Sequence, residues 1–523
     1  MSTFTEPMIY WQGLAPSLVI LGAAVLGVLV EAFVPRRPRL AVQSVLAVAA
    51  ILCSYVLLAG QWALTTGEPP LMGEMASGFS LDAFGVAAQG IILVIGLFAV
   101  LTMADRTSAG DGAFAAQAAD RPGRAEETES LHAGWMGTEA LPLTMFSLGG
   151  MMLFPLTSGF IPLFVILELV SLPLYVMAAM ARHRRLLSQE AALKYFVLGA
   201  FSSAFLLLGS ALLYGATGFV SYSSVAQVME YTRGAGTGFI MPAGLLLLLV
   251  GLLFKIAAAP FHAWSPDVYQ GSPTPVTGFM AAGVKATAFL ALVRVMGVLG
   301  VAHLGDLRGA LCAIAVLTML VGTVVGIVQR DIKRMLAYSA IAHAGYMLIG
   351  LIALNAVSVS ALLVYSLVYG VSTVGAFGIV SLVRVSHGGA AGAEATDLSA
   401  YRGLGRRAPW LASAMTVFML SFAGIPLTAG FIAKYELFVA AVFGGEVWLV
   451  GAAVASSAAT AFFYTRVIVL MFFREPQGQD VVVVGSRGPV AAAVTMAAAL
   501  TVLVGVLPEP LLTVLSSAAM LAP

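Results

Sequence analysis

The stretch that decides the fold runs from Phe254 to Lys285 and reads FKIAAAPFHAWSPDVYQGSPTPVTGFMAAGVK. One lysine stands near its beginning, at Lys255, and another at its end, each within an otherwise apolar run. Between them lie prolines, a tryptophan, a histidine and an aspartate, which an uninterrupted membrane helix would not carry together. Because a lysine in hydrocarbon costs about 2.5–3.5 kcal/mol on insertion scales, two so close together indicate a function. The stretch predicts a broken membrane helix that handles protons.

The composition of the whole chain is that of a polytopic membrane protein. Of its 523 residues, 60% are hydrophobic and only 10% are charged, whereas soluble domains carry about 25% charged residues. The net charge of +1 gives no basis for nucleic-acid binding. Cys53 and Cys312 both lie in apolar runs, so we expect two buried thiols, with neither a disulfide framework nor a metal site.

Apolar runs of about 20 residues, the length that crosses a bilayer, predict an all-α fold with fourteen membrane spans. The seventh and twelfth runs are too long for one straight helix and contain proline, which predicts that both are discontinuous. The spans are expected at residues 14–34, 41–64, 80–104, 140–157, 159–181, 190–215, 239–270, 274–300, 307–329, 335–354, 357–384, 410–443, 447–473 and 489–515.

Basic residues in the loops predict the orientation, because cytoplasmic loops carry an excess of Lys and Arg. With fourteen spans, every basic cluster falls on one side, which we expect to be cytoplasmic, and both termini are then outside. The exceptions on the other side are Arg233 and Arg308. Loops 105–139 and 385–409 are expected to be mobile cytoplasmic segments without chemistry. The clusters are Arg36, Arg37 and Arg39; Arg182, Arg184 and Arg185; Arg330, Lys333 and Arg334; Arg402, Arg406 and Arg407; and Arg474 with Arg487.

The two broken spans indicate an internal repeat. The twelfth span follows the seventh by five helices, and each places a lysine beside its interruption: Lys255 before Pro260, and Lys434 after Pro426. Since five is odd, the two copies would be inverted in the membrane. Inverted repeats with paired discontinuous helices are typical of transport folds whose site lies near the midplane.

Ionisable residues inside the spans are the candidate functional residues. Glu168, at the centre of the fifth span, is expected to pair with a lysine on another helix. The alternative is a glutamate that is held neutral or is bonded locally to Ser171. Lys255 and Lys285 both lie deep in their spans, although the Lys255 ammonium could instead reach the cytoplasmic face. Burial favours the neutral amine and a nearby carboxylate favours the ammonium, so opening and closing such a pair would release and reload a proton.

Lys434 is a fourth main candidate, and Lys194, His262 and His343 are secondary candidates for the same chemistry. Lys434 cannot be neutralised within its helix by Glu436, because positions i and i+2 do not share a face; the alternative is a lysine at the outer interface. Lys194, at the start of the sixth span, is either an interfacial lysine or a member of a relay. His262 and His343 lie at the break or inside a span, and a neutral imidazole can pass protons or serve only in packing.

Three other charged or titratable residues and the prolines complete this set. Arg294 and His303, towards the outer end of the eighth span, could line an exit, and Arg466 in the thirteenth span needs a partner that the sequence does not identify. The prolines of the two breaks free backbone carbonyls, which must then face water or protein, so hydrated cavities are expected beside the lysines.

Several segments together resemble the antiporter-like membrane subunits of respiratory complex I, the NADH–quinone oxidoreductase. The run PFHAWSPDVYQGSPTPV at residues 260–276 is similar to the signature of this family. The form PDVYQGxPxPVT followed by a lysine resembles the subunit N branch more than the L and M branches. The agreement extends over about residues 140–475, through ELVSLPLY around Glu168, LKYFVLGAFSSAFLLLG from Leu193, DIKRMLAYSAIAHAGYMLIG from Asp331 and SFAGIPLTAGFIAKYELF around Lys434.

The resemblance implies two inverted five-helix units, spans 4–8 and 9–13. It also implies that Glu168 and Lys255 form a buried pair, that Lys285 is the central relay, and that Lys434 is the terminal site. The implied division is residues 1–139 for three helices and an acidic loop, 140–300 for the first unit, 301–475 for the second unit, and 476–523 for the last helix.

The implied function is proton translocation in the membrane arm of a bacterial NADH–quinone oxidoreductase, within the cell inner membrane. NAD, FMN, iron–sulfur clusters and quinone are expected in other subunits of the complex, and no cofactor is expected in this chain. The expected partners are the M-type and the small K-, J- and A-type membrane-arm subunits and the lipid bilayer, without nucleic acid. Two alternatives stay open: a subunit of a multisubunit Na⁺/H⁺ antiporter, which shares the scaffold, and a structural subunit whose lysines only hold helices together.

Overall fold

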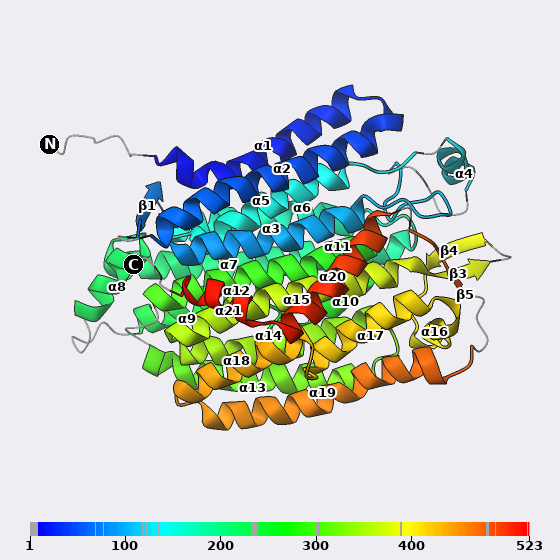
Figure 1. Cartoon of the computed structure of the whole chain (residues 1–523). Helices are drawn as coiled ribbons and strands as arrows, with labels where there is room; N and C mark the ends of the chain where they lie inside the picture. The colour runs from blue at the N-terminus through cyan, green and yellow to red at the C-terminus, as the bar shows by residue number, and fades with distance from the viewer. Residues whose placement is uncertain are drawn as a thin grey trace.

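The structure is a computed structural model in which long helices run side by side, with the connecting segments gathered at the two ends (Figure 1). Within the described part of the chain, eleven helices are long and apolar enough to cross a membrane, and three shorter apolar helices lie among them. The chain is therefore a helical membrane protein, as its composition predicts. The structure describes residues 9–67, 70–76, 78–117, 120, 124–133, 135–231, 239–299, 304–387, 390–476, 481–486, 488–519 and 521.

Helices occupy each apolar run of the sequence. The longer helices are α1 (Trp11–Phe33), α2 (Arg36–Thr65), α3 (Ala83–Met103), α5 (Ala140–Leu153), α6 (Phe160–Ala178), α7 (Arg185–Thr217), α9 (Ile240–Lys255), α12 (Lys285–Val298), α13 (Leu304–Val328), α14 (Ile332–Ala353), α15 (Ala356–Leu382), α17 (Pro409–Ala423), α18 (Ala429–Phe443), α19 (Val447–Phe473) and α20 (Pro489–Val506). The shorter ones are α4 (Ala125–His132), α8 (Tyr222–Tyr231), α10 (Trp264–Gly271), α11 (Thr274–Phe279), α16 (Leu404–Arg407), α21 (Glu509–Ser516), and the turns η1 (Phe154–Leu156), η2 (Met280–Val284) and η4 (Leu398–Tyr401).

The two longest apolar runs are interrupted, as their prolines predict. The first is interrupted between α9 and α10, and the second between α17 and α18. Gly424 ends α17 with a φ of +80°, a backbone conformation that glycine adopts without the steric penalty of a side chain. A third irregularity is the π-helical turn η2, which directly precedes α12. Such turns are rare and occur frequently at functional sites.

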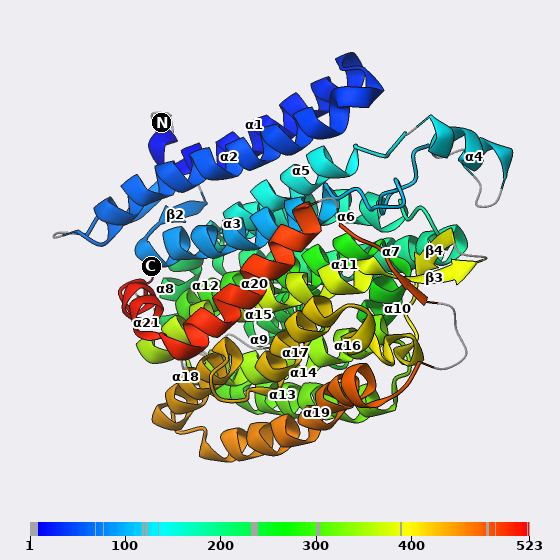
Figure 2. The same ribbon diagram turned by 45° about the vertical axis from the view of Figure 1, so that its right-hand side comes forward.

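The most buried helices lie at the centre of the bundle. Nearly every residue of α11–α12, α14 and α15 is buried, whereas α1, α2, α7, α13 and α19 leave large apolar areas exposed. The hairpin of α1 and α2 lies along one side and α19 along the opposite side (Figure 2). Cys312 is buried as expected, but Cys53 is exposed, because it faces outward from the peripheral helix α2.

The expectation of a purely α-helical chain was incomplete, because the described residues include five short strands. β1 (Gly73–Ala76) pairs with β2 (Phe79–Leu81) at one end of the bundle. At the other end, β3 (Val383–His387) pairs antiparallel with both β4 (Ala390–Glu394) and β5 (Val481–Val483) (Figure 1). Part of the segment 385–409, which was expected to be mobile, therefore belongs to a small sheet.

The acidic segment after α3 also differs from the expected mobile loop. Asp105 accepts a hydrogen bond from Ser486 at 2.6 Å, and Asp111 lies 3.5 Å from the His183 ring. Burial raises the pKa of Asp105. Burial also acts to raise the pKa of Asp111, but the His183 hydrogen bond and the charge of Arg384 outweigh it and bring that pKa to about 2. These carboxylates hold the segment against the α19–α20 connection and the α6–α7 connection.

The basic clusters gather at the end that carries β3, β4 and β5. Arg184 donates to the carbonyl of Glu394 in β4 at 3.0 Å, and Arg407 donates to the carbonyl of Val481 in β5 at 3.1 Å. The backbone N–H of Leu398, beyond β4, donates to the Arg330 carbonyl at 2.8 Å. α16 lies at this end as well, while β1, α8 and α21 lie at the opposite one (Figure 1). Of the residues named above as loop cations, Arg233 and Arg487 fall outside the described residues.

Candidate functional site

Lys255 is buried inside the protein and does not extend to the loops. It lies in the last turn of α9, is 3% exposed, and donates a hydrogen bond from its ammonium to the hydroxyl of Ser171 in α6 at 2.8 Å. The rings of Tyr175 and Tyr195 lie 5.7 and 5.8 Å from its Nζ, within the range of cation–π attraction. The alternative of an ammonium at the cytoplasmic face does not fit this geometry.

Glu168 does not contact Lys255 directly, contrary to expectation. Among the described residues, no ion pair within 4 Å joins them; Glu168 instead accepts a hydrogen bond from Ser203 of α7 at 2.5 Å. Ser171 lies one turn after Glu168 on the same face of α6, and its hydroxyl also donates to the Leu167 carbonyl at 2.5 Å. A hydroxyl can donate and accept together, so Ser171 holds the ammonium without the carboxylate.

Lys285 lies at the centre of the protein. It is the first residue of α12, is 2% exposed, and donates a hydrogen bond to the carbonyl of Ala340 in α14. The ring of Tyr369 in α15 lies 6.0 Å from its Nζ. Within the described part of the chain, its contacts are thus a neutral carbonyl and an aromatic face, so dipoles stabilise any positive charge on this side chain.

His343 links several buried hydroxyls one turn after Ala340 on α14. Its Nδ1 is hydrogen-bonded to the Tyr365 hydroxyl at 2.6 Å, and its Nε2 lies 3.3 Å from the Tyr464 hydroxyl. The Tyr464 hydroxyl is in turn 2.5 Å from Ser339. A cavity of about 10 Å³ adjoins this ring and is lined by Tyr365, Ser421 and Gly430, among others. This volume suffices for about one water molecule.

Lys434 sits against the break between α17 and α18. Its ammonium donates to the carbonyls of Phe422 and Ala423 at 2.9 and 3.1 Å and to the Ser457 hydroxyl at 2.7 Å. These carbonyls end α17 and have no helical partner, and the C-terminal end of a helix is the negative end of its dipole. Lys434 is 5% exposed, and the Tyr346 ring lies 5.0 Å from its Nζ. It is therefore a buried residue and not an interfacial lysine.

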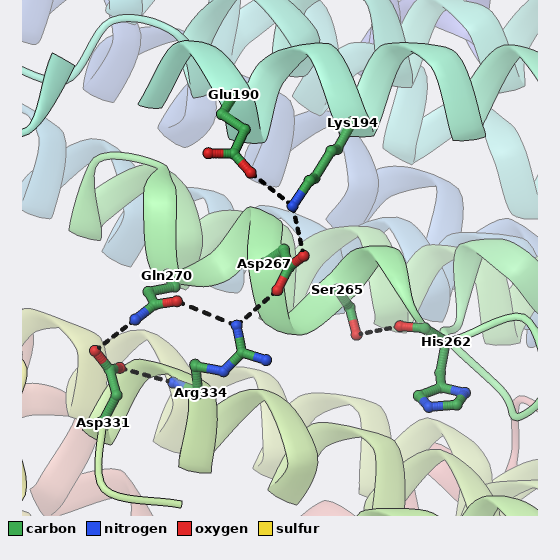
Figure 3. Close-up of polar contacts among 8 residues, drawn as sticks. All are labelled: Glu190, Lys194, His262, Ser265, Asp267, Gln270, Asp331 and Arg334. Carbon is green, nitrogen blue, oxygen red and sulfur yellow. Dashed lines mark hydrogen bonds and ion pairs between the residues drawn. The ribbon is translucent and has the colours of Figure 1, made fainter. Parts of the chain in front are cut away.

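Lys194 belongs to an ionic network around α10 that the sequence did not reveal (Figure 3). Its ammonium lies 2.8 Å from both Glu190 and Asp267. Asp267 also binds Arg334 of α14 at 2.6 Å, and Arg334 donates to Gln270 at 3.1 Å. The side chains are a quarter to a half exposed, so each pair contributes only about 0–1 kcal/mol.

The signal that could have identified Asp267 is its place directly after Pro266, in the short helix α10 that follows the break. A carboxylate there has no neutralising residue nearby in the chain, so it must find one on another helix. His262, in the same break, is half-buried; its carbonyl accepts a hydrogen bond from Ser265 at 3.1 Å, and its imidazole points away from the ion pairs (Figure 3).

Two arginines of the spans have partners. Arg294, expected to line an exit, is fully buried and forms a two-pronged ion pair with Asp82, which also begins α3 by accepting from the Gly85 N–H at 2.8 Å. Arg466 donates to the Ile327 carbonyl near the end of α13 at 3.1 Å. His303 lies outside the described residues.

Comparison with known proteins decides the family. A family model described as NADH:quinone oxidoreductase/Mrp antiporter, TM, matches residues 157–460. A protein of Beutenbergia cavernae named NADH-quinone oxidoreductase subunit N is 47% identical to this chain, over 98% of this chain and 99% of its own length. The chain belongs to the NADH-quinone oxidoreductase subunit N family. The resemblance drawn from the sequence is confirmed.

This subunit N homologue shares its fold with single chains of two membrane complexes of known structure. A chain in the respiratory complex I of Thermus thermophilus with bound aureothin is 33% identical and superposes with a TM-score of 0.73, covering 96% of this chain and all of that one. A chain of the Mrp complex from Dietzia sp. DQ12-45-1b is 19% identical, with a TM-score of 0.78 and 97% of each chain covered. This last likeness concerns the fold alone.

Within the described residues, no group of three or more His, Cys, Asp or Glu side chains could hold a metal ion.

Proposed function

We propose that this chain is an antiporter-like, proton-translocating subunit in the membrane arm of an NADH–quinone oxidoreductase, and that Glu168, Lys255, Lys285 and Lys434 carry the protons. The observation that carries the proposal is the burial of three lysines with hydroxyls, carbonyls and rings as partners. Electron transfer, with its NAD, FMN, iron–sulfur clusters and quinone, takes place in other subunits. The membrane-arm partners are subunits of the M, K, J and A types.

The proton route runs across the centre of the bundle. Protons reach Lys255 from the end with the basic clusters, where Lys194 and His262 serve as secondary relay residues. From Lys255 they pass to Lys285 and on through His343 to Lys434. Ala340 and His343 lie one turn apart on α14, and the carbonyl of Phe422 binds Lys434 while its ring lies 5.7 Å from His343. Water molecules bridge the remaining gaps.

The partners of the lysines explain how a proton is released. A buried ammonium is stabilised far better by a carboxylate than by neutral groups, so its charge state responds to the distance of the nearest acid. Glu168 is held by Ser203 in this state, one helical turn from the serine that binds Lys255. Movement of Glu168 towards Lys255 would load that lysine, and its return to Ser203 would favour release towards Lys285.

We further propose that the fourteen apolar runs all cross the membrane, with the basic clusters in the cytoplasm and both termini outside. The shorter apolar stretches then complete spans through their partners, α9 with α10 and α17 with α18. A lysine lies beside each of the two breaks, Lys255 at the end of α9 and Lys434 in α18, and this recurrence supports two units of opposite orientation, residues 140–300 and 301–475.

The decisive experiment replaces Lys285 and follows acidification of inverted membrane vesicles driven by NADH. Lys285→Met removes the charge, and Lys285→Arg keeps a cation that cannot release its proton. Both variants are expected to lose most proton pumping while the complex still assembles. Full pumping by Lys285→Met would refute the relay role. Assembly lost in Lys285→Met and pumping kept in Lys285→Arg would favour a purely structural lysine.

The same vesicles separate this function from sodium–proton antiport. The 47% identity to a subunit N, against 19% to the Mrp chain, favours the oxidoreductase. NADH-driven acidification is then expected without sodium, whereas an antiporter subunit would require a sodium gradient and would not co-purify with NADH oxidation.

A further inference from the structure

One carboxylate ties the short helix α10 to both halves of the protein. Oδ2 of Asp267 binds the ammonium of Lys194 in α7 at 2.8 Å, and its Oδ1 binds the guanidinium of Arg334 in α14 at 2.6 Å (Figure 3). α7 lies within residues 140–300 and α14 within residues 301–475. Asp267 is therefore the side chain of α10 that carries ion pairs to both halves, beside the neutral hydrogen bonds that Gln270 makes to Arg334 and Asp331 at 3.1 and 3.0 Å.

The end of α10 packs closely on the backbone of α7. At Gly271, the last residue of the helix, an added Cβ would lie 2.5 Å from the Ala191 Cβ and 2.6 Å from the Leu187 carbonyl oxygen. This end therefore rests directly on the backbone of α7. The beginning of α10 follows the non-helical turn of residues 256–263. A tilt of α10 would thus pivot at Gly271 and displace its beginning.

The beginning of α10 forms part of the wall around Lys255. Trp264 stacks on the rings of Tyr195 and Phe254 at 4.9 and 5.3 Å, and its indole N–H donates to the Phe254 carbonyl at 2.9 Å. Tyr195 directly follows Lys194 in the chain, and its ring lies 5.8 Å from the Lys255 ammonium. A displacement of Trp264 would therefore open the aromatic wall beside Lys255.

We propose that Asp267 is a positioning residue that works as a latch: while it bridges Lys194 and Arg334, α10 keeps the approach to Lys255 closed, and when the bridge opens, α10 tilts and admits water. This inference rests on the proposed route of protons through Lys255. The ion pairs suit a latch because they are weak. Lys194 is 41% exposed, Asp267 35% and Arg334 26%, so water competes for every partner. Glu190 offers Lys194 a second carboxylate on its own helix, which can keep the ammonium when Asp267 leaves.

The latch is tested by the accessibility of a cysteine placed at the beginning of α10. Ser265 is buried, and Ser265→Cys is close to isosteric; Cys53 and Cys312 are first replaced by Ser and Ala. The rate of labelling by a membrane-impermeant maleimide is measured in the assembled complex, in inverted vesicles. Asp267→Asn removes the bridge and is expected to raise the rate about fivefold, the effect of losing weak ion pairs on an open–closed equilibrium.

Three variants serve as controls in the same background. Asp267→Glu keeps the carboxylate and should return labelling to near the parental rate. Glu475→Gln removes the carboxylate of an exposed pair with Arg406, which lies away from α10, and should leave the rate unchanged. Arg334→Gln opens the bridge from its other side and repeats the test if Asp267→Asn fails to assemble. Parental labelling in both Asp267→Asn and Arg334→Gln overturns the latch.

The two measurements test different proposals: proton pumping tests the proposed function, and the labelling rate tests the latch. If Lys285→Met retains full pumping, the proposed function is refuted, and the labelling rates still decide whether α10 opens. If Lys285→Met abolishes pumping while Asp267→Asn labels at the parental rate, the function stands and the latch is refuted.

Discussion

Lys434 and Phe422 meet across the break between α17 and α18, where the ammonium donates to the Phe422 carbonyl at 2.9 Å. The break thus creates the binding partner of the lysine, because the carbonyl is available only where the helix ends. Gly424 makes that end possible through its φ of +80°. The same glycine also lies against the lysine, since an added Cβ would lie 2.9 Å from the Lys434 Cδ.

Gly424→Ala is therefore expected to displace Lys434 and to lower NADH-driven proton pumping. The strain of an alanine at positive φ amounts to about 1 kcal/mol. Gly445→Ala is the matched control, because Gly445 has a φ of +82° with no atoms near the added Cβ. Both variants should lose similar thermal stability, measured on the purified complex, but only Gly424→Ala should lose pumping. Equal pumping by the two would contradict the role of this contact.

Tyr365→Phe should slow proton transfer between Lys285 and Lys434. It removes the hydroxyl that lies 2.6 Å from the His343 Nδ1 while keeping the ring. Loss of a hydrogen bond of about 1 kcal/mol predicts a pumping rate lower by about fivefold.

Tyr401→Phe is the control for this change. Tyr401 is also buried, and within the described part of the chain its hydroxyl has no hydrogen-bond partner. Its removal should leave the initial rate of vesicle acidification unaltered. If both phenylalanine variants pump at the parental rate, His343 does not depend on Tyr365.

Ser171→Ala is expected to destabilise the charged form of Lys255. The variant removes the acceptor that lies 2.8 Å from the ammonium, and an unsatisfied buried donor of this kind costs about 1–3 kcal/mol. Acidification should therefore slow, and its optimum should move to lower pH, where protonation of the amine is easier. Ser210→Ala should change neither the rate nor the optimum, because the Ser210 hydroxyl, as far as the described residues show, bonds just to the Leu206 carbonyl of its own helix.

The acidic segment after α3 should loosen in acid. The pKa of Asp111 is depressed to about 2 despite its burial, because His183 and Arg384 stabilise the carboxylate. A depressed pKa contributes stability that is present above the unfolded value of about 4 and is lost as the pH falls towards 2. Proteolysis of the segment should accelerate over this window in the parent.

Asp111→Asn removes this dependence. At pH 7 the variant should be cleaved faster than the parent, by thermolysin added to inverted vesicles. Near pH 2 the two should be cleaved by pepsin at similar rates. Equal cleavage at pH 7 would mean that the carboxylate does not hold the segment.

The sequence was most informative where a residue type was locally out of place. Prolines and glycines in apolar runs predicted both helix breaks, since their backbone restrictions act within a few residues. The lysines were predicted to be buried from their apolar neighbours, and the structure places Lys255, Lys285 and Lys434 inside. The segment of residues 260–276, together with the similar segments around Glu168, Leu193, Asp331 and Lys434, indicated the family.

Contacts between distant segments could not be predicted in the same way. The partner of Lys255 depends on which face of α6 turns towards α9, and Ser171 rather than Glu168 occupies it. Asp267 joins three helices that lie far apart in sequence. Strand β3 pairs with β5 about 100 residues later, and neither strand is long enough to show an alternating pattern.

The Asp82–Arg294 pair has a consequence for the movement of protons through the protein. Both side chains are almost without exposure, and Arg294 also donates to the Pro155 carbonyl at 3.0 Å. A guanidinium keeps its proton at any physiological pH, so Arg294 cannot accept and pass on a proton that moves along α12 away from Lys285. Under the proposed route, this ion pair blocks proton transfer through the half that contains Lys255, at the end near β2. We therefore expect protons to leave through the half that contains Lys434, so that the molecule would have two breaks but a single outlet.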